Sequence, residues 1–275
     1  FLGRCSHKAL FLYSPSFSLI NSSTIKTVSN LGNLKIPFNS LPSCDGQKFT
    51  NAVVDLGKVY EIYPLGNLAP PGHTTPTEHM YLHLFGQNTT TETIPLFAPA
   101  DIQIFNVTSD PDDLVSERTE YVIIFAVCKE FFGYFDHVKE ISSDLKKALD
   151  EVECQKFNTG DQSSCSKQIL FKASAGTEIG KVGHKQGNFD FGAYDYRKQN
   201  QYADNSRYGP DNGGLFRPRS LYVTCPLEYY DEPLKSQNYS KIQRTQEPKC
   251  GQIVQDIFGT LQGNWFNEIG TPNTI

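Results

Sequence analysis

One stretch constrains the fold of this chain more than any other: residues 64–101, which read PLGNLAPPGHTTPTEHMYLHLFGQNTTTETIPLFAPAD. A loop rich in glycine and proline passes into a strand-like run, and a second strand-like run ends in APAD. Three of the chain's six histidines, His73, His79 and His83, lie there together with Glu78. Imidazoles and a carboxylate at a loop-to-strand junction are the ligand types that zinc prefers. The stretch therefore predicts a polar pocket with metal-binding character at the start of a strand.

The run His79-Met-Tyr-Leu-His83 is typical of a strand rather than a helix. Side chains two positions apart share one face of a strand, so His79, Tyr81 and His83 are expected to point the same way. Both histidines then point into a pocket or both point to solvent. We expect His79 to point inward and leave His83 undecided.

The composition favours a mainly β protein. The 275 residues include 21 Gly and 16 Pro, and many are Val, Ile, Thr, Tyr or Phe, which suits short strands joined by turns. The formal net charge of −5, without a Lys/Arg cluster, argues against nucleic-acid binding. No apolar run has the length needed to cross a bilayer. The longest such run, Tyr121–Cys128, predicts a buried strand.

We expect three regions along the chain. Residues 1–44 read as N-terminal strands, or as an extended arm that adds to the sheet edge of another subunit. Residues 45–195 form a β core with one short helix, SDLKKALDEVEC, which Ser142 or Ser143 caps. The acidic segment Asp110–Glu120 is read as a solvated loop. Residues 196–275 lack a linker and a core-sized apolar content of their own, so they are expected to wrap the core.

Three features indicate export to the extracellular space or the cell surface. The chain begins at Phe1 rather than Met, which is typical of a processed product. It holds seven cysteines with no CxxC pair, a pattern that favours disulfides over zinc or redox chemistry. Four N-x-[ST] motifs predict a secreted glycoprotein with acceptors at Asn21, Asn88, Asn106 and Asn238.

The cysteines suggest a pairing scheme, although spacing alone does not fix connectivity. Cys5 and Cys44 would close the N-terminal strand pair, and Cys154 and Cys165 would close a polar loop. A Cys225–Cys250 pair is plausible as well. The scheme leaves Cys128 as a buried, inert thiol in an apolar strand.

Five short sequence blocks follow one another along the chain in this order: GHTTPTEH, IPLFAPAD, YFDHV, AGTEIGKVG and FDFGAYD. This order resembles the lysostaphin-type (LytM-like) zinc endopeptidases, which cut peptide cross-bridges in bacterial cell walls. The resemblance covers roughly residues 64–195. It implies an antiparallel β-sheet or sandwich core of the lysostaphin-like (duplicated hybrid motif-like) type with long loops. Blocks including YVTCPLEYY also look like those of a group of uncharacterised secreted proteins that share this core.

The resemblance implies roles for particular residues, and the match is incomplete. His73 stands where the family has its first zinc ligand, and Glu78, beside His79, lies one position beyond the expected carboxylate. His137 maps onto a histidine of the catalytic pocket. The family's closing H-x-H block is replaced by Phe-Asp-Phe, which leaves Asp190 as one carboxylate in place of two imidazoles.

These departures favour a non-catalytic protein: an extracellular binding module or a structural, assembling subunit. Its partners would be an extracellular peptide or glycan, or copies of itself. The alternative is a zinc endopeptidase in which His73, Glu78 or His79, and Asp190 hold the metal and His137 assists the bound water. A tyrosine-rich segment could supply stacking surfaces for sugar, or could be a packed loop; it holds Tyr194, Tyr196, Tyr202 and Tyr208.

Overall fold

The structure is a computed structural model, and it describes residues 41–45, 48–69, 75–85, 91–111, 119–159, 162–208 and 219–264. The chain divides into two compact units, Phe1–Leu34 and Lys35–Ile275, and every described residue belongs to the second. The predicted N-terminal arm, residues 1–44, therefore lies outside the described residues except at its last four positions.

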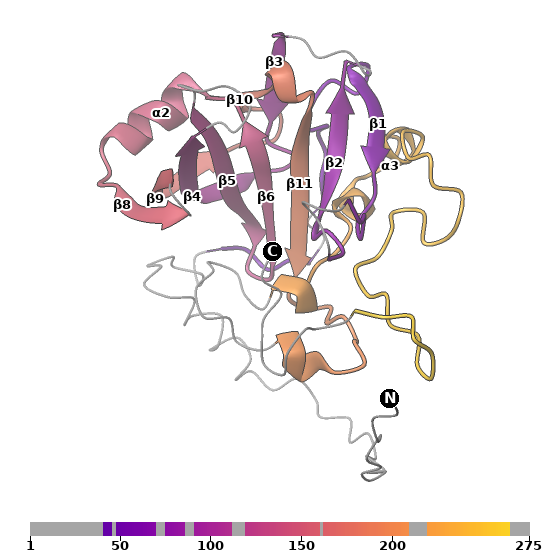
Figure 1. The fold of residues 1–275 in the computed structure, drawn as a ribbon. Coiled ribbons are helices and arrows are strands. Elements are labelled where there is room, and N and C mark those ends of the chain that lie inside the picture. The colour runs from indigo at the N-terminus through magenta and orange to yellow at the C-terminus, as the bar shows by residue number, and fades with distance from the viewer. Residues whose placement is uncertain are drawn as a thin grey trace. The chain divides into compact units, whose positions relative to one another are not determined.

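Eight antiparallel strands form one large sheet in the order β1-β2-β11-β6-β5-β4-β9-β8 (Figure 1). Their bounds are β1 Val59–Tyr63, β2 His79–Leu84, β4 Ile102–Pro111, β5 Thr119–Cys128, β6 Phe131–Val138, β8 Gln155–Thr159, β9 Gln162–Ala173 and β11 Asn188–Asp195. The predicted buried strand, Tyr121–Cys128, makes up the last eight residues of β5. Its residues from Phe125 to Cys128 are at most 5% exposed.

A second, smaller sheet has the order β3-β10-β7. It consists of β3 Thr93–Phe97, β7 Glu140–Ile141 and β10 Glu178–Gly183. Strand β10 contacts β6 and β11 of the large sheet. The mainly β, antiparallel architecture is therefore as predicted.

Side chains alternate between the two faces along each strand, and the core covers both faces of the large sheet at β4 and β5 but mainly one face at β2. On β2, Met80, Leu82 and Leu84 are fully buried, whereas the alternate positions are only partly covered. Phe189 and Phe191 of β11 pack on Phe135 of β6. This phenylalanine-rich face leaves the opposite face of the same three strands for polar side chains.

The predicted helix is α2, Ser143–Asp150. Ser142 is its N-cap and accepts a hydrogen bond from the backbone of Leu145. Leu145 and Leu149 form its buried face, as the helical spacing predicts. The expectation of a single helix is wrong, because a second α-helix, α3, spans Leu234–Tyr239. Among the described residues, neither helix has the length and apolarity required to cross a membrane.

Backbone contacts tie the described C-terminal residues 219–264 to the large sheet. Ile62 of β1 donates its N–H to the carbonyl of Lys241 over 3.0 Å. An isolated bridge joins Leu65 to Gly251, and another joins Tyr194 to Val223. These contacts place C-terminal segments beside β1 and β11.

The described residues contain three disulfides, and two of them, Cys154–Cys165 and Cys225–Cys250, are the predicted pairs. The predicted pairing of Cys44 with Cys5 is wrong, because Cys44 pairs with Cys128. The segment before β1 runs past the end of β5, where the backbone of Lys129 donates to the carbonyl of Pro42. Cys128 is therefore not a free thiol, and Cys5 lies outside the described residues.

Two of the four predicted glycan acceptors do not suit that role in this fold. Asn106 is 0% exposed, and its amide nitrogen donates to Ser166 Oγ over 2.8 Å. Asn238 is 1% exposed, and its amide nitrogen donates to the carbonyl of Leu234. An N-linked glycan needs this nitrogen at the surface, so burial argues against a glycan at both positions. Asn21 and Asn88 lie outside the described residues.

Candidate functional site

The polar face of the large sheet is organised around one carboxylate, Asp190, at the third position of β11. Its Oδ2 lies 3.1 Å from His79 Nε2 and 3.7 Å from His137 Nε2. The three side chains come from β2, β11 and β6, which are adjacent strands. They are 15%, 5% and 25% exposed, respectively. The sheet thus brings together three of the residues that the sequence singled out.

Each imidazole also has a partner on its other nitrogen. His79 Nδ1 lies 2.8 Å from the hydroxyl of Tyr134, and His137 Nδ1 lies 3.1 Å from Glu120 Oε2. The same Glu120 oxygen accepts a 2.7 Å hydrogen bond from Lys139 Nζ, whose side chain is 2% exposed. A chain of contacts therefore crosses β2, β11, β6 and β5. We refer to its members as the polar cluster: Tyr134, His79, Asp190, His137, Glu120 and Lys139.

Strand register explains why these side chains meet. Gly192 stands opposite His79 on one side and opposite Tyr134 on the other. A Cβ atom at Gly192 would lie 1.9 Å from a carbon of the Tyr134 ring. Because glycine has no Cβ, the ring can lie across β11 and its hydroxyl can reach His79. The absent side chain of Gly192 is thus a requirement of the cluster.

The backbone at His137 is unusual, because this residue has a φ of 60°. Positive φ costs energy in a non-glycine residue and persists only where other contacts enforce it. Here Asp136 Oδ1 accepts a 2.6 Å hydrogen bond from the backbone N–H of His137. The imidazole is then directed between Glu120 and Asp190.

The charges of the cluster shift its pKa values. Burial lowers the pKa of His137, but the hydrogen bond with Glu120 and the charges of Asp136 and Asp190 outweigh burial and raise it to about 9. Burial raises the pKa of Asp190 to about 7. Burial also acts to raise the pKa of Glu120, but His137 and Lys139 hold it below its usual value. At neutral pH, His137 therefore joins Lys139 as a cation beside Glu120.

The other predicted ligands do not join the cluster in the described structure. Glu78 accepts a hydrogen bond from Ser220 Oγ, so the structure gives this carboxylate a different partner. His73 lies outside the described residues. His83 shares the face of His79, as strand periodicity predicts, and its ring lies 4.4 Å from that of Tyr63. Burial lowers the pKa of His83.

Sequence reasoning missed three members of the cluster as partners. The motif that contains Tyr134 does not indicate its partner, no sequence pattern identifies Lys139, and the acidic segment that contains Glu120 is predicted to be a solvated loop. That prediction is wrong for Glu120, because Glu120 is 7% exposed. The pairing of Tyr121 with Val138 brings the neighbouring Glu120 and Lys139 together. No local sequence signal reports such a pairing between strands.

The residues are of the types that bind zinc, but their donor atoms already lie in contact with one another. His79 and Asp190 offer an imidazole nitrogen and a carboxylate oxygen, both suitable donors. His137 lies between the carboxylates of Glu120 and Asp190, which favour its protonated form, so a metal would have to compete with that proton. A catalytic zinc site has three protein ligands. Glu120, Asp136 and His137 bring ligand atoms within 4.8 Å of one another, but Glu120 already binds Lys139 and Asp136 already accepts from the backbone of His137. We therefore derive no reaction step through zinc.

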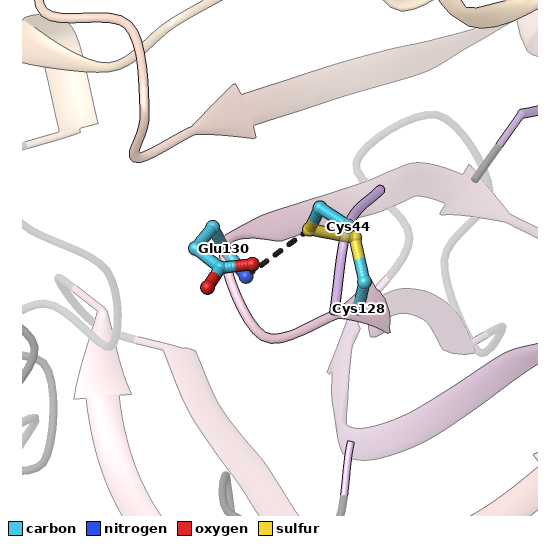
Figure 2. Close-up of side chains that lie close together, drawn as sticks. All are labelled: Cys44, Cys128 and Glu130. Carbon is cyan, nitrogen blue, oxygen red and sulfur yellow. Dashed lines mark hydrogen bonds between the residues drawn. A yellow bond between two sulfur atoms is a disulfide. The ribbon is translucent and has the colours of Figure 1, made fainter. Parts of the chain in front are cut away.

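A second group of ligand-type residues, Cys44, Cys128 and Glu130, lies at the end of β5 (Figure 2). The two sulfurs are joined as a disulfide, and Cys44 Sγ accepts a 3.3 Å hydrogen bond from the backbone of Glu130. A disulfide offers no thiolate to a metal. This group is therefore a structural crosslink that joins the segment before β1 to the end of β5.

The tyrosine-rich segment does not form an open stacking surface. Tyr194 is 1% exposed and Tyr202 is 8% exposed. Tyr196 stacks on Tyr222 with 4.6 Å between ring centroids. Tyr202 therefore lies in a packed loop, as the alternative predicts, and Tyr194 is packed within strand β11. The side chain of Tyr208 lies outside the described part.

Comparison with known proteins does not assign this chain to a family. No protein-family model matches the chain, and no curated protein matches it either. The likeness to lysostaphin-type endopeptidases thus remains a prediction from motifs. The geometry of the polar cluster is therefore the basis for assigning a function to this chain.

Gly192→Ala should destabilise the protein by about 2 kcal/mol, because the added methyl group collides with the Tyr134 ring. Urea unfolding measures the change. The matched background is Tyr134→Ala, in which the ring is gone and the same glycine substitution should cost much less. An equal cost in both backgrounds would show that the ring does not need Gly192.

The free energy of unfolding of the metal-free protein should fall as the pH rises from 7 to 9. His137 and Asp190 both have folded-state pKa values above their ordinary values of 6.5 and 3.8. Their contribution is complete below the unfolded pKa and is lost as the pH passes the folded pKa. We expect a slope of about 1 kcal/mol per pH unit in urea titrations. His137→Gln should flatten the slope, and a flat wild-type profile would contradict the assigned charges.

Proposed function

We propose that this chain is a secreted, non-catalytic glycoprotein that acts as an extracellular binding or assembly subunit on a degenerate lysostaphin-like core. The observation that carries the proposal is the self-compensated charge of the polar cluster. Asp190 contacts His79 and His137, His137 contacts Glu120, and Glu120 contacts Lys139. The chain itself thus supplies the positive charge that a metal would supply in an enzyme.

Electrostatics supports this interpretation. A divalent cation next to Asp190 would face the charge of His137 at a point where water is largely excluded, and like charges repel strongly there. To accept the metal, His137 would have to lose a proton that Glu120 and Asp136 help to retain. Metal binding would also disrupt the 3.1 Å contact between His79 Nε2 and Asp190 Oδ2. Each step opposes the formation of a zinc centre.

An extracellular location is compatible with the three disulfides, which persist in oxidising surroundings. If the protein carries N-linked glycans, Asn21 and Asn88 are the remaining acceptors, since Asn106 and Asn238 are buried. Burial of Tyr194 and Tyr202 removes a candidate sugar platform. Assembly, or binding of an extracellular peptide, therefore gains weight relative to glycan binding.

One observation favours the alternative, a zinc endopeptidase. Metal-binding histidines commonly direct their second nitrogen to a carboxylate or another polar group that fixes the ring. His79 has Tyr134 in this position, and His137 has Glu120. In this alternative, His79 and Asp190 would hold the metal together with His73. The same geometry also suits a salt-bridged cluster without metal.

Metal content distinguishes the two functions. Elemental mass spectrometry of protein purified without chelators, followed by calorimetric titration with zinc, should show far less than one zinc per chain. Site-specific uptake of about one zinc per chain, lost in His79→Ala and retained in His83→Ala, would overturn the proposal. His83 is the matched control because it shares the face of β2 with His79 but lies outside the polar cluster.

A further inference from the structure

The two edge strands of the large sheet, β1 and β8, differ in whether their outer backbone groups are hydrogen-bonded. At one end, the backbone of β1 is partly paired, since Ile62 donates to the carbonyl of Lys241. At the other end lies β8, which pairs with β9 on its inner side only. Among the described residues, no segment hydrogen-bonds to the outer side of β8. Natural proteins rarely leave a regular edge strand open, because it is a template for another strand.

Strand β8 is held in an extended form by its hairpin with β9. All five of its residues pair in register with β9, from Gln155 opposite Ser166 to Thr159 opposite Gln162. The disulfide between Cys154 and Cys165 fastens the base of this hairpin. Alternate residues of β8 therefore direct their N–H and C=O groups outward in a fixed geometry. A partner strand would meet an edge that is already ordered.

Phe157 marks the middle of this edge. It is the third of the five residues of β8, and it is 44% exposed. An exposed phenylalanine at the centre of an edge strand is unusual, since edges are commonly protected by charges or proline. The strand contains one charged residue, Lys156, and no proline.

The sequence of β8 is complementary to itself. If a second copy pairs antiparallel about a two-fold axis at Phe157, that residue meets its own counterpart. Lys156 then stands opposite residue 158, an asparagine, and Gln155 opposite residue 159, a threonine. No like charges oppose one another, and the central pair is aromatic, which stabilises cross-strand contacts. A two-fold interface requires this kind of self-complementarity.

We propose that β8 is a homodimerisation edge, at which two copies of this chain join their large sheets through antiparallel β8–β8 pairing centred on Phe157. The proposal deepens the assembly role within the proposed function and requires no particular chemistry at the polar cluster. Five paired residues bury less surface than a permanent interface, so the association is weak and depends on concentration.

Sedimentation velocity over protein concentrations from about 1 µM to about 1 mM covers the affinity range of small interfaces. The wild-type protein should shift from monomer to dimer within this range. Phe157→Glu removes the aromatic pair and sets two like charges opposite each other, so it should weaken dimerisation about tenfold or more. Gln155→Glu is the matched control: it adds the same charge to the same strand, opposite a threonine, and should change the dissociation constant less than about threefold.

The proposal is overturned if the wild-type protein stays monomeric throughout, or if the two variants weaken dimerisation equally. A dimer that Phe157→Glu leaves intact places the interface elsewhere and also overturns it. Circular dichroism and thermal unfolding establish that each variant is folded. Because zinc uptake is measured separately, failure of the dimer and failure of the proposed function are distinguishable.

Discussion

The pairing of β11 with β2 on one side and β6 on the other is the constraint on which the rest of this structure depends. It places Phe189 and Phe191 against the core and turns Asp190 and Gly192 to the opposite face. A shift of one residue in either register would exchange the two faces. It would bury Asp190 among phenylalanines and expose aromatic rings to solvent, so hydrophobic burial also fixes the geometry of the polar cluster.

The polar cluster is better suited to specify this register than to add stability. Buried ion pairs often contribute little net stability, because desolvation offsets the attraction between the charges. Loss of one partner is costly, since it leaves a buried charge uncompensated. We infer that the cluster penalises wrong registers of β2, β11, β6 and β5. This role explains a set of charged side chains that cross four strands without requiring that they perform chemistry.

The sequence predicts features that depend on local periodicity and composition. Strand alternation in β2, the capped helix α2 and two of the three disulfides follow from patterns within a short window. The Cys44–Cys128 bond and the partnership of Glu120 with His137 depend on pairing between segments far apart in the chain. Burial of Asn106 depends on its central place in β4, which the glycosylation motif does not report. Residue types alone thus identify His79, Asp190 and His137 as candidate site residues. Their contact partners depend on how the strands pair in the sheet.

The motif resemblance and the charge pattern suggest different functions, and the charge pattern has the more direct physical consequence. A scaffold related to zinc endopeptidases can retain its strands while its metal ligands are replaced, because packing and ligation involve opposite faces of the sheet. In this chain, Glu120 lies between His137 and Lys139, so part of the ligand-type group is already engaged in contacts within the protein. The assembly role that we propose would use the same sheet through its edge strand β8.

The most direct test of this account is X-ray diffraction at the zinc absorption edge from crystals grown with excess zinc. The account predicts no anomalous peak between His79, Asp190 and His137, with Asp190 still in contact with His79. A strong peak coordinated by His79 Nε2 and Asp190 would contradict it and establish a metal centre on the polar face.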